Sequence, residues 1–184
     1  MNTEHKSNTP TEIRDLWQTP KALFDYYDKR FGFDIDLAAS ADNALCDEYC
    51  TESENALLHD TFQDKLHNLG LIEDGAEYKK PSVWCNPPYS NLMPWVKTMV
   101  DYAGSYRVKI VTIVPADTSV KWFKYAFDNC SECHFISGRI SFINAETQKP
   151  VNGNNKGSVV FVFDPNSPFK SQVCLLERDE IMGK

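Results

Sequence analysis

Four consecutive residues, Asn86-Pro87-Pro88-Tyr89, carry the strongest chemical signal, and they directly follow the short apolar run 82–85. Two adjacent prolines remove two backbone donors and fix φ, so the carbonyl groups of Asn86 and Pro87 are held in one geometry. The Asn86 side-chain oxygen beside a rigid carbonyl would present two acceptors to one point. This pattern favours a site that binds both hydrogens of an amino group, with Tyr89 as a flat stacking face. The alternative is a purely structural proline turn.

A second candidate segment lies at the end of the expected strand 33–37, where Asp36 and Leu37 are followed by the small residues Ala38 and Ala39. In open α/β sheets, ligands bind outside the carboxyl ends of the strands. Small residues there let a ligand approach the backbone, and an acid can bind a cationic or hydroxylated group. The Gly-rich loop usual at such a site is missing, and a solvated strand end is the alternative.

A third segment is Trp17-x-Thr19-Pro20, at the predicted start of a helix. Thr19 is a good N-cap and Pro20 suits the first helical position. The free helix N-terminus and the Thr19 hydroxyl could bind a carboxylate. A plain N-cap beside a packed tryptophan explains the same residues equally well.

The elements that must position these segments alternate between strand and helix along the chain. Hydrophobic periodicity and the turn residues predict helices over 20–31, over 40–46, from 91 and from 119, strands over 33–37, 49–51, 82–85, 108–114, 134–136, 139–143 and 158–163, and an insertion or long loop over 59–80. Gly32 is predicted to end the first helix. The loop 152–157 is predicted to join the last two strands as a hairpin. The sequence therefore predicts an α/β fold, parallel in the middle of the sheet with an antiparallel edge.

Composition describes a globular protein, with 42% hydrophobic residues among 184 and a formal net charge of −7. Residues 1–16 are predicted to be a flexible leader, and 17–184 a single domain. The chain has no apolar run long enough for a membrane span and no signal peptide, so we expect a cytoplasmic protein whose six cysteines are reduced thiols. No ligand spacing indicates a metal site, and we expect none.

Charge is distributed unevenly along the chain. Residues 31–64 contain nine acids and no Lys or Arg, whereas residues 81–170 contain nine bases and six acids. The overall negative charge argues against nonspecific coating of nucleic acid. A polyanion would avoid the first stretch and tolerate the second, although an ordinary acidic surface gives the same pattern.

In this order, the segments resemble the phage-type DNA adenine-N6-methyltransferase family, the phage Dam family. The resemblance covers about Trp17 to Asp164. It is carried by Trp17-x-Thr19-Pro20-x-x-Leu23-Phe24, Phe31-Gly32-Phe33-Asp34-Ile35-Asp36-Leu37-Ala38-Ala39-Ser40, Asn43-Ala44, Tyr49-x-Thr51, Trp84-x-Asn86-Pro87-Pro88-Tyr89-Ser90, Trp95-Val96, Pro115-Ala116-Asp117-Thr118, Trp122-Phe123 and Gly138-Arg139-Ile140-x-Phe142. The chain departs from the wider methyltransferase class by lacking glycines in the first cofactor loop.

The resemblance implies a Rossmann-like methyltransferase that uses S-adenosyl-L-methionine and acts on a flipped-out adenine in double-stranded DNA. It implies a catalytic segment Asn86, Pro87, Pro88 and Tyr89, in which Asn86 and Pro87 accept the hydrogen bonds of the adenine amino group. The implied cofactor contacts are Trp17, Thr19, Pro20, Asp36, Leu37, Ala38 and Ala39. Either Asn55 or Asp60 would supply a further contact to the cofactor or the base.

The resemblance also implies a phage- or prophage-encoded enzyme in the cytoplasm of a bacterial host. Bases in the later half are then the candidates for contact with DNA phosphates: Lys121, Lys124, Arg139, Lys149 and Lys156. Recognition of the DNA sequence would fall to loops, with 59–80 and 144–157 as candidates.

Two competing functions fit part of the same pattern. Protein glutamine N5-methyltransferases also use Asn-Pro-Pro-Tyr, but their cofactor loop is usually glycine-rich and their chains are longer. A catalytically weak relative that only binds DNA is compatible with the glycine-free loop, whereas the intact Asn86-Pro87-Pro88-Tyr89 segment argues against it.

Overall fold

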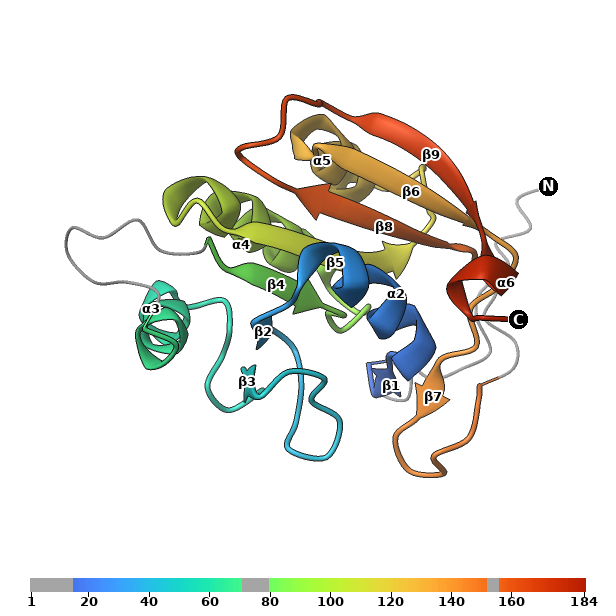
Figure 1. Ribbon diagram of the computed structural model, residues 1–184, viewed down its shortest axis with the longest axis horizontal. Coiled ribbons are helices and arrows are strands. Elements are labelled where there is room, and N and C mark those ends of the chain that lie inside the picture. The colour runs from blue at the N-terminus through green and yellow to red at the C-terminus, as the bar shows by residue number, and fades with distance from the viewer. Residues whose placement is uncertain (1–14, 71–79, 152–155) are drawn as a thin grey trace.

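A computed structural model describes residues 15–70, 80–151 and 156–184, which form a seven-stranded sheet with helices on both faces (Figure 1). The strand order is β3-β2-β4-β5-β8-β6-β9, and two short strands, β1 and β7, pair in a separate ribbon. In chain order the elements are β1 (Trp17–Gln18), α2 (Lys21–Phe31), β2 (Ile35–Asp36), β3 (Glu48–Tyr49), α3 (His59–Asn68), β4 (Ser82–Cys85), α4 (Leu92–Ser105), β5 (Lys109–Pro115), α5 (Lys121–Asn129), β6 (Glu132–Ser137), β7 (Ile143–Asn144), β8 (Ser158–Phe163), β9 (Gln172–Glu177) and α6 (Arg178–Ile181).

The centre of the sheet is built from continuous apolar sequence. All residues of β4 and β8 are buried, and so are five of the seven in β5. Strands covered on both faces require this pattern rather than an alternation of apolar and polar residues. Strands β3, β2, β4 and β5 run parallel to one another. The predicted mixed α/β class with a mostly parallel sheet is therefore confirmed.

Parallel pairing of β2 with β4 brings two of the candidate segments together. Asp36 lies opposite Trp84, so both strands end at the same edge of the sheet. The segments that follow, beginning at Leu37 and at Asn86, leave this edge side by side. This is the edge at which open α/β sheets bind their ligands.

The predicted C-terminal hairpin is wrong. Within the segment 139–143 only Ile143 belongs to a strand, β7, which pairs with β1 rather than with β8. Strand β8 runs antiparallel to both β5 and β6, inside the sheet instead of at its edge. The physical reason is the sequence Ser-Val-Val-Phe-Val-Phe, which is apolar on both faces and gains most by insertion between two strands.

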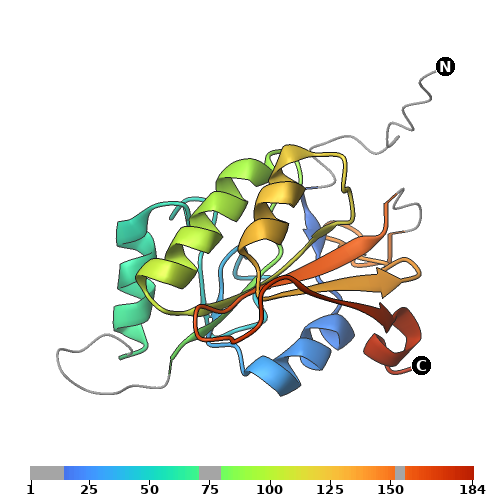
Figure 2. The same ribbon diagram turned by 90° about the horizontal axis from the view of Figure 1, so that it is seen from above.

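Two hydrophobic cores lie on opposite faces of the sheet. Helices α3, α4 and α5 cover one face, and α2 and α6 cover the other (Figure 2). Successive residues of β8 alternate between the cores, with Phe161 facing α5 and Val160 and Val162 facing α2. The region described contains no helix long and apolar enough to cross a membrane.

Helix α3 occupies part of the stretch predicted to be a long loop, so that prediction is wrong for 59–68. Phe62 and Leu66 are spaced by four residues and are 0% and 1% exposed, and the Phe62 ring stacks on Tyr102 of α4 at 4.3 Å. Packing against α4 stabilises a helix whose own pattern is weak. Residues 71–79, also within the predicted loop, lie outside the described residues.

Three predictions of helix boundaries need correction. The segment 40–46 forms turns rather than a helix. Pro20, not Thr19, occupies the N-cap position of α2, and no side chain caps that end. Val120, not Ser119, is the N-cap of α5. Gly32 ends α2 as predicted, in the left-handed conformation with φ of 61° that favours glycine.

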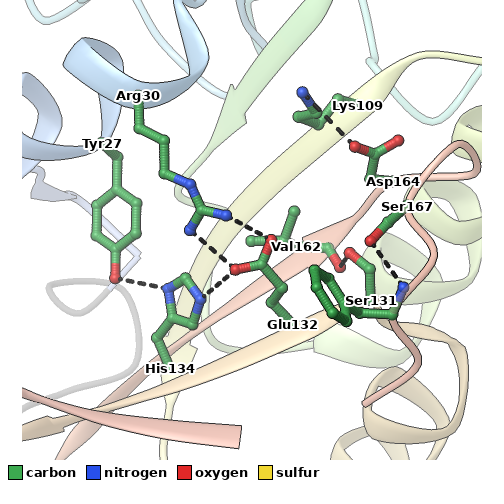
Figure 3. A network of polar contacts seen from close by, with 10 residues as sticks. Tyr27, Arg30, Lys109, Ser131, Glu132, His134, Val162, Asp164 and Ser167 are labelled. Atoms are coloured by element: carbon green, nitrogen blue, oxygen red, sulfur yellow. Dashed lines mark hydrogen bonds and ion pairs between the residues drawn. The ribbon is translucent and has the colours of Figure 1, made fainter. Parts of the chain in front are cut away.

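A polar network connects α2 to the sheet (Figure 3). Arg30 donates two hydrogen bonds to Glu132, at 2.8 and 2.7 Å, and His134 contacts the same carboxylate at 2.9 Å. The other ring nitrogen of His134 lies 3.3 Å from the Tyr27 hydroxyl. Burial lowers the pKa of His134, so the neutral ring is favoured. The network fixes the helix that follows Thr19-Pro20.

Candidate active site

A cavity of about 1080 Å³ opens where β2 and β4 end, beside the β1–β7 ribbon. All three segments singled out in the sequence contribute to its wall. Those of their residues that line the cavity are Trp17, Thr19, Asp36, Leu37, Ala38, Ala39, Asn86 and Pro88. Sites for small molecules are usually concave and lie at such strand ends, so this cavity is the candidate active site.

The Asn86 side chain presents an unused acceptor at this cavity. Its amide nitrogen donates to the Trp17 carbonyl at 2.9 Å. Its oxygen is buried and finds no hydrogen-bond partner in the part of the chain that the structure describes. A buried acceptor without a donor costs about 1–3 kcal/mol, which a bound donor would recover. The Trp17 carbonyl therefore fixes the orientation of the Asn86 amide and leaves its oxygen without a donor among the described residues.

The ribbon of β1 and β7 holds that carbonyl in place. Trp17 lies opposite Asn144 in the antiparallel pair, and its indole stacks on Phe142 with ring centroids 5.9 Å apart. Both rings are buried, at 7% and 1% exposure. Sequence reasoning missed the ribbon because two-residue strands have no periodicity. The only available signal was the aromatic pair itself.

The two residues just before the ribbon, Asp15 and Leu16, also contribute to the site. The Ser90 amide, next to the proline segment, donates to the Asp15 carboxylate at 2.9 Å. Asp15 and Leu16 both line the cavity. They belong to the predicted leader 1–16, whose other residues, 1–14, lie outside the described part of the chain.

Asp36 organises the loop after β2. Its carboxylate accepts the Ala38 amide at 3.4 Å and the Leu45 amide at 3.2 Å, and the residue is 4% exposed. Burial raises the pKa of Asp36 to about 6, although the two backbone hydrogen bonds oppose this shift. The Ala39 amide donates to the Cys50 carbonyl at 3.0 Å, which ties the loop to the chain after β3.

Four carboxylates and no Lys or Arg are among the lining residues. The acids are Asp15, Asp36, Asp42 and Glu52. Sequence reasoning did not select Asp42 or Glu52, although both belong to the base-free stretch 31–64. A concave site with acids on its wall favours a ligand that carries positive charge.

The two alternatives for a further contact are placed differently. Asn55 lines the cavity and adopts a left-handed backbone conformation with φ of 57°, which asparagine tolerates better than most residues. Its side-chain oxygen accepts the Leu57 amide at 3.3 Å. Asp60 lies in the first turn of α3 and does not line the cavity. Of these two residues, only Asn55 therefore lies at the cavity.

Among the candidate prolines and Tyr89, only Pro88 lines the cavity. Pro88 lines it, whereas Pro87 is buried and Pro20 and Tyr89 are not among the lining residues. The Tyr89 hydroxyl donates to the Ile113 carbonyl at 3.5 Å, and its ring meets Phe142 edge-on at 6.1 Å. Burial raises the pKa of Tyr89, so its hydroxyl stays protonated. In this arrangement the Tyr89 ring packs against Phe142, the residue just before β7.

The bases proposed for DNA contact lie on several different elements. Lys121 and Lys124 lie on α5, and Lys124 pairs with Asp128. Arg139 is exposed after β6. Lys149 is exposed in the loop after β7, next to Gln148, which lines the cavity. Lys156 forms an ion pair with Asp117, and this lowers the pKa of that carboxyl group.

In the part of the chain that the structure describes, no three His, Cys, Asp or Glu side chains are grouped to hold a metal ion. All six cysteines are free thiols. Burial is the largest cause of the raised pKa at each of Cys46, Cys50, Cys85, Cys130, Cys133 and Cys174. Reactive thiolates need the opposite environment, so the geometry does not favour cysteine chemistry.

Comparison with known proteins identifies the class that this fold and site define. The family model described as DNA N-6-adenine-methyltransferase (Dam) matches residues 6–184, and the chain belongs to this family. The resemblance inferred from the sequence segments is thereby confirmed.

Two relatives are phage proteins named DNA N-6-adenine-methyltransferase. The protein of Escherichia phage T1 is 34% identical over 172 residues, a match that covers 85% of this chain and 65% of the relative. The protein of Haemophilus phage HP1 is 31% identical over 169 residues, covering 90% of this chain and 88% of the relative. The chain thus spans slightly less than two thirds of the T1 protein and most of the HP1 protein.

Proposed function

We propose that this chain transfers a methyl group from S-adenosylmethionine to the N6 amino group of an adenine flipped out of duplex DNA, at specific sites. The observation that carries the proposal is the buried, unpartnered side-chain oxygen of Asn86, a residue that lines the cavity. Family membership supports the same chemistry.

The cavity fits the proposed cofactor in size and charge. Its volume of about 1080 Å³ exceeds what one small ligand needs and leaves room for a base beside the cofactor. Its wall is acidic, which suits a sulfonium cation. Ala38 and Ala39 leave space beside the backbone, and Asn55, Trp17 and Thr19 complete the wall. When bound, this cofactor supplies an electrophilic methyl group.

Asn86 and Pro87 would activate the adenine amino group without forming a covalent bond to it. The nitrogen lone pair of adenine is delocalised into the ring, so the free base is a poor nucleophile. The Asn86 oxygen and the Pro87 carbonyl would each accept one amino hydrogen, which lets the nitrogen become pyramidal and direct its lone pair toward the methyl donor. Positioning and preorganised dipoles then account for the rate.

The target base must leave the helical stack to reach this site. Flipping costs a few kcal/mol of pairing and stacking. Tyr89 follows the prolines directly, and a face of its ring would stack on the flipped base and return about 1–3 kcal/mol. Because Tyr89 does not line the cavity in this structure, that role requires its ring to move toward the cavity.

The destination of the methyl label tests the proposal against its alternatives. The protein would be incubated with methyl-labelled cofactor, duplex DNA and a protein extract together. Label in DNA supports the proposal. Label in glutamine side chains would establish the protein methyltransferase instead, and cofactor binding without transfer would establish the binding-only relative. The phage relatives make a bacterial cytoplasm, where DNA is accessible, the proposed place of action.

Asp36 is expected to make cofactor affinity depend on pH. As the pH falls through about 6, the buried carboxylate takes up a proton and its hydrogen bonds to the Ala38 and Leu45 amides weaken. Cofactor affinity measured by calorimetry should therefore fall below that pH. The Asp36→Asn variant should bind more weakly than the parent and lose this pH dependence.

The stability effect of the same group has the opposite sign. The native pKa of Asp36 is about 6, above its ordinary value of 3.8. The folded chain therefore holds this proton more tightly, and the contribution of Asp36 to the free energy of unfolding rises as the pH falls from above 6 toward 4. An Asp36→Asn chain whose cofactor affinity falls with the parent's at low pH would contradict the assignment.

Lys149 is expected to contact a DNA phosphate. It is exposed in the loop whose neighbours Ala145 and Gln148 line the cavity, so DNA that delivers a base there would pass close by. Lys149→Glu should weaken DNA binding, and its plot of log affinity against log salt should be shallower by about one. Lys29→Glu, at an exposed position of α2, is the matched control with the same charge change. Equal salt slopes for the two variants would show that Lys149 does not contact DNA.

A further inference from the structure

Strand β9 forms one edge of the sheet and is unusually apolar for an edge. It pairs with β6 on one side, and no described strand pairs with its other side (Figure 1). Val173 and Leu175 are 54% and 67% exposed, and Phe169, just before the strand, is 56% exposed. These are three of the five large apolar side chains that are exposed in the described part of the chain.

The charges, prolines and glycines that usually keep a sheet edge from pairing are absent from β9 except for its last residue, Glu177. Segment 171–176 has no charged residue, no proline and no glycine. The other edge strand, β3, is only two residues long and begins with Glu48. A six-residue edge with free amide and carbonyl groups is a template for another strand, and proteins that avoid such pairing place charges or prolines there.

We propose that β9 pairs antiparallel with β9 of a second copy of this chain, which joins the two sheets across a two-fold axis. In an antiparallel pair, residues opposite each other point to the same face of the sheet, so under two-fold symmetry their numbers are both odd or both even. The two-fold axis therefore lies between the two copies of one residue. Centring the axis on Cys174 places Val173 against Leu175 of the second copy, and the reverse. The four exposed apolar side chains then cover one another on a single face of the joined sheet.

Charges at the ends of the strand favour this antiparallel arrangement and a second copy as the occupant. Lys170 is exposed before β9 and Glu177 is exposed at its end. Neither has an ion-pair partner within the described ranges. In the register centred on Cys174, Glu177 lies opposite Ser171 of the second copy, next to its Lys170. Two antiparallel copies of β9 therefore place opposite charges near each other, whereas two parallel copies would place like charges together.

The proposed interface is independent of the active site. Strand β9 lies at the opposite end of the strand order from β3 and β2, whose ends border the cavity. None of the residues from 169 to 177 lines that cavity. Joining two chains through β9 therefore leaves both cavities open, and the proposal does not depend on the methyl-transfer reaction.

Sedimentation velocity from about 1 to about 100 μM protein tests the proposal. The parent should sediment as a dimer at the upper concentrations, and the double variant Val173→Lys/Leu175→Lys as a monomer. Leu58→Lys, which replaces another exposed leucine far from β9, is the matched control and should remain dimeric. A monomeric parent, or a dimer that persists in the double variant, would overturn the proposal.

Charge exchange provides a milder set of variants that keep the apolar strand intact. Lys170→Glu should weaken the dimer, and Lys170→Glu/Glu177→Lys should restore it.

Oxidation tests the register, because residues opposite each other across an antiparallel pair have Cα atoms about 4.5–5.5 Å apart, within reach of a disulfide. A Cys174-dependent covalent dimer supports the register, with Cys174→Ser as its control. A dimer that yields no such bond would refute it.

Discussion

The Asn86→Ala variant is expected to slow single-turnover methyl transfer by about 10²–10³-fold, the usual effect of losing one preorganised hydrogen-bond partner. The Asn86 oxygen has no partner among the described residues, so removing it breaks no internal bond on that side. Its interaction with the amino group strengthens as charge develops on the nitrogen, so the loss should occur in the chemical step. Cofactor affinity, measured by calorimetry, should be close to that of the parent.

Asn91→Ala is the matched control for this experiment. Asn91 lies five positions later, at the N-cap of α4, where its side chain forms no capping hydrogen bond and does not line the cavity. Its rate should equal that of the parent. If Asn86 were only a structural residue of a proline turn, its loss would lower the melting temperature and preserve the rate per folded molecule. Thermal melts and single-turnover rates of both variants distinguish the two outcomes.

The Phe142→Ala variant is expected to lower the free energy of unfolding by about 3–5 kcal/mol and also to reduce the rate. Phe142 is 1% exposed and contacts both Trp17 and Tyr89. Its loss leaves a cavity beneath the ribbon and frees the Trp17 carbonyl that orients the Asn86 amide. Misplacing a catalytic group by about 1 Å can cost up to about 10²-fold in rate.

Phe161→Ala separates this positioning effect from simple loss of stability. Phe161 is 0% exposed and packs in the other core, on the face of the sheet covered by α5. Both variants should unfold at lower denaturant concentration than the parent. Under conditions where each remains folded, only Phe142→Ala should be slow. Equal rates for the two variants would show that the ribbon does not position Asn86.

The parallel half of the sheet, and the approach of the segments that follow β2 and β4, could both be predicted from the sequence. Strand β5 is continuously apolar, and the segments after β2 and β4 carry distinctive residues at the ends of parallel strands. Strand ends of a parallel sheet share one edge, so the sequence pattern alone predicts that residues far apart in the chain meet there. Asp36 and Asn86 are the clearest examples, since both line the cavity.

The features that were missed depend on contacts between distant segments. The β1–β7 ribbon consists of two-residue strands, and the Trp17 ring stacks on Phe142 beside them. No local sequence pattern predicts this ribbon. Helix α3 forms because Phe62 meets Tyr102, and β8 lies inside the sheet because both of its faces are apolar. Local propensity is a weak guide where tertiary packing decides the structure.

The identity of the methylated atom tests the central claim most directly. Duplex DNA would be incubated with the parent chain and a cofactor whose methyl group carries deuterium, then digested to nucleosides for mass spectrometry. The account predicts deuterated N6-methyldeoxyadenosine from the parent and almost none from Asn86→Ala in the same time. Label on cytosine, or unmodified DNA from a parent chain that binds the cofactor, would contradict it.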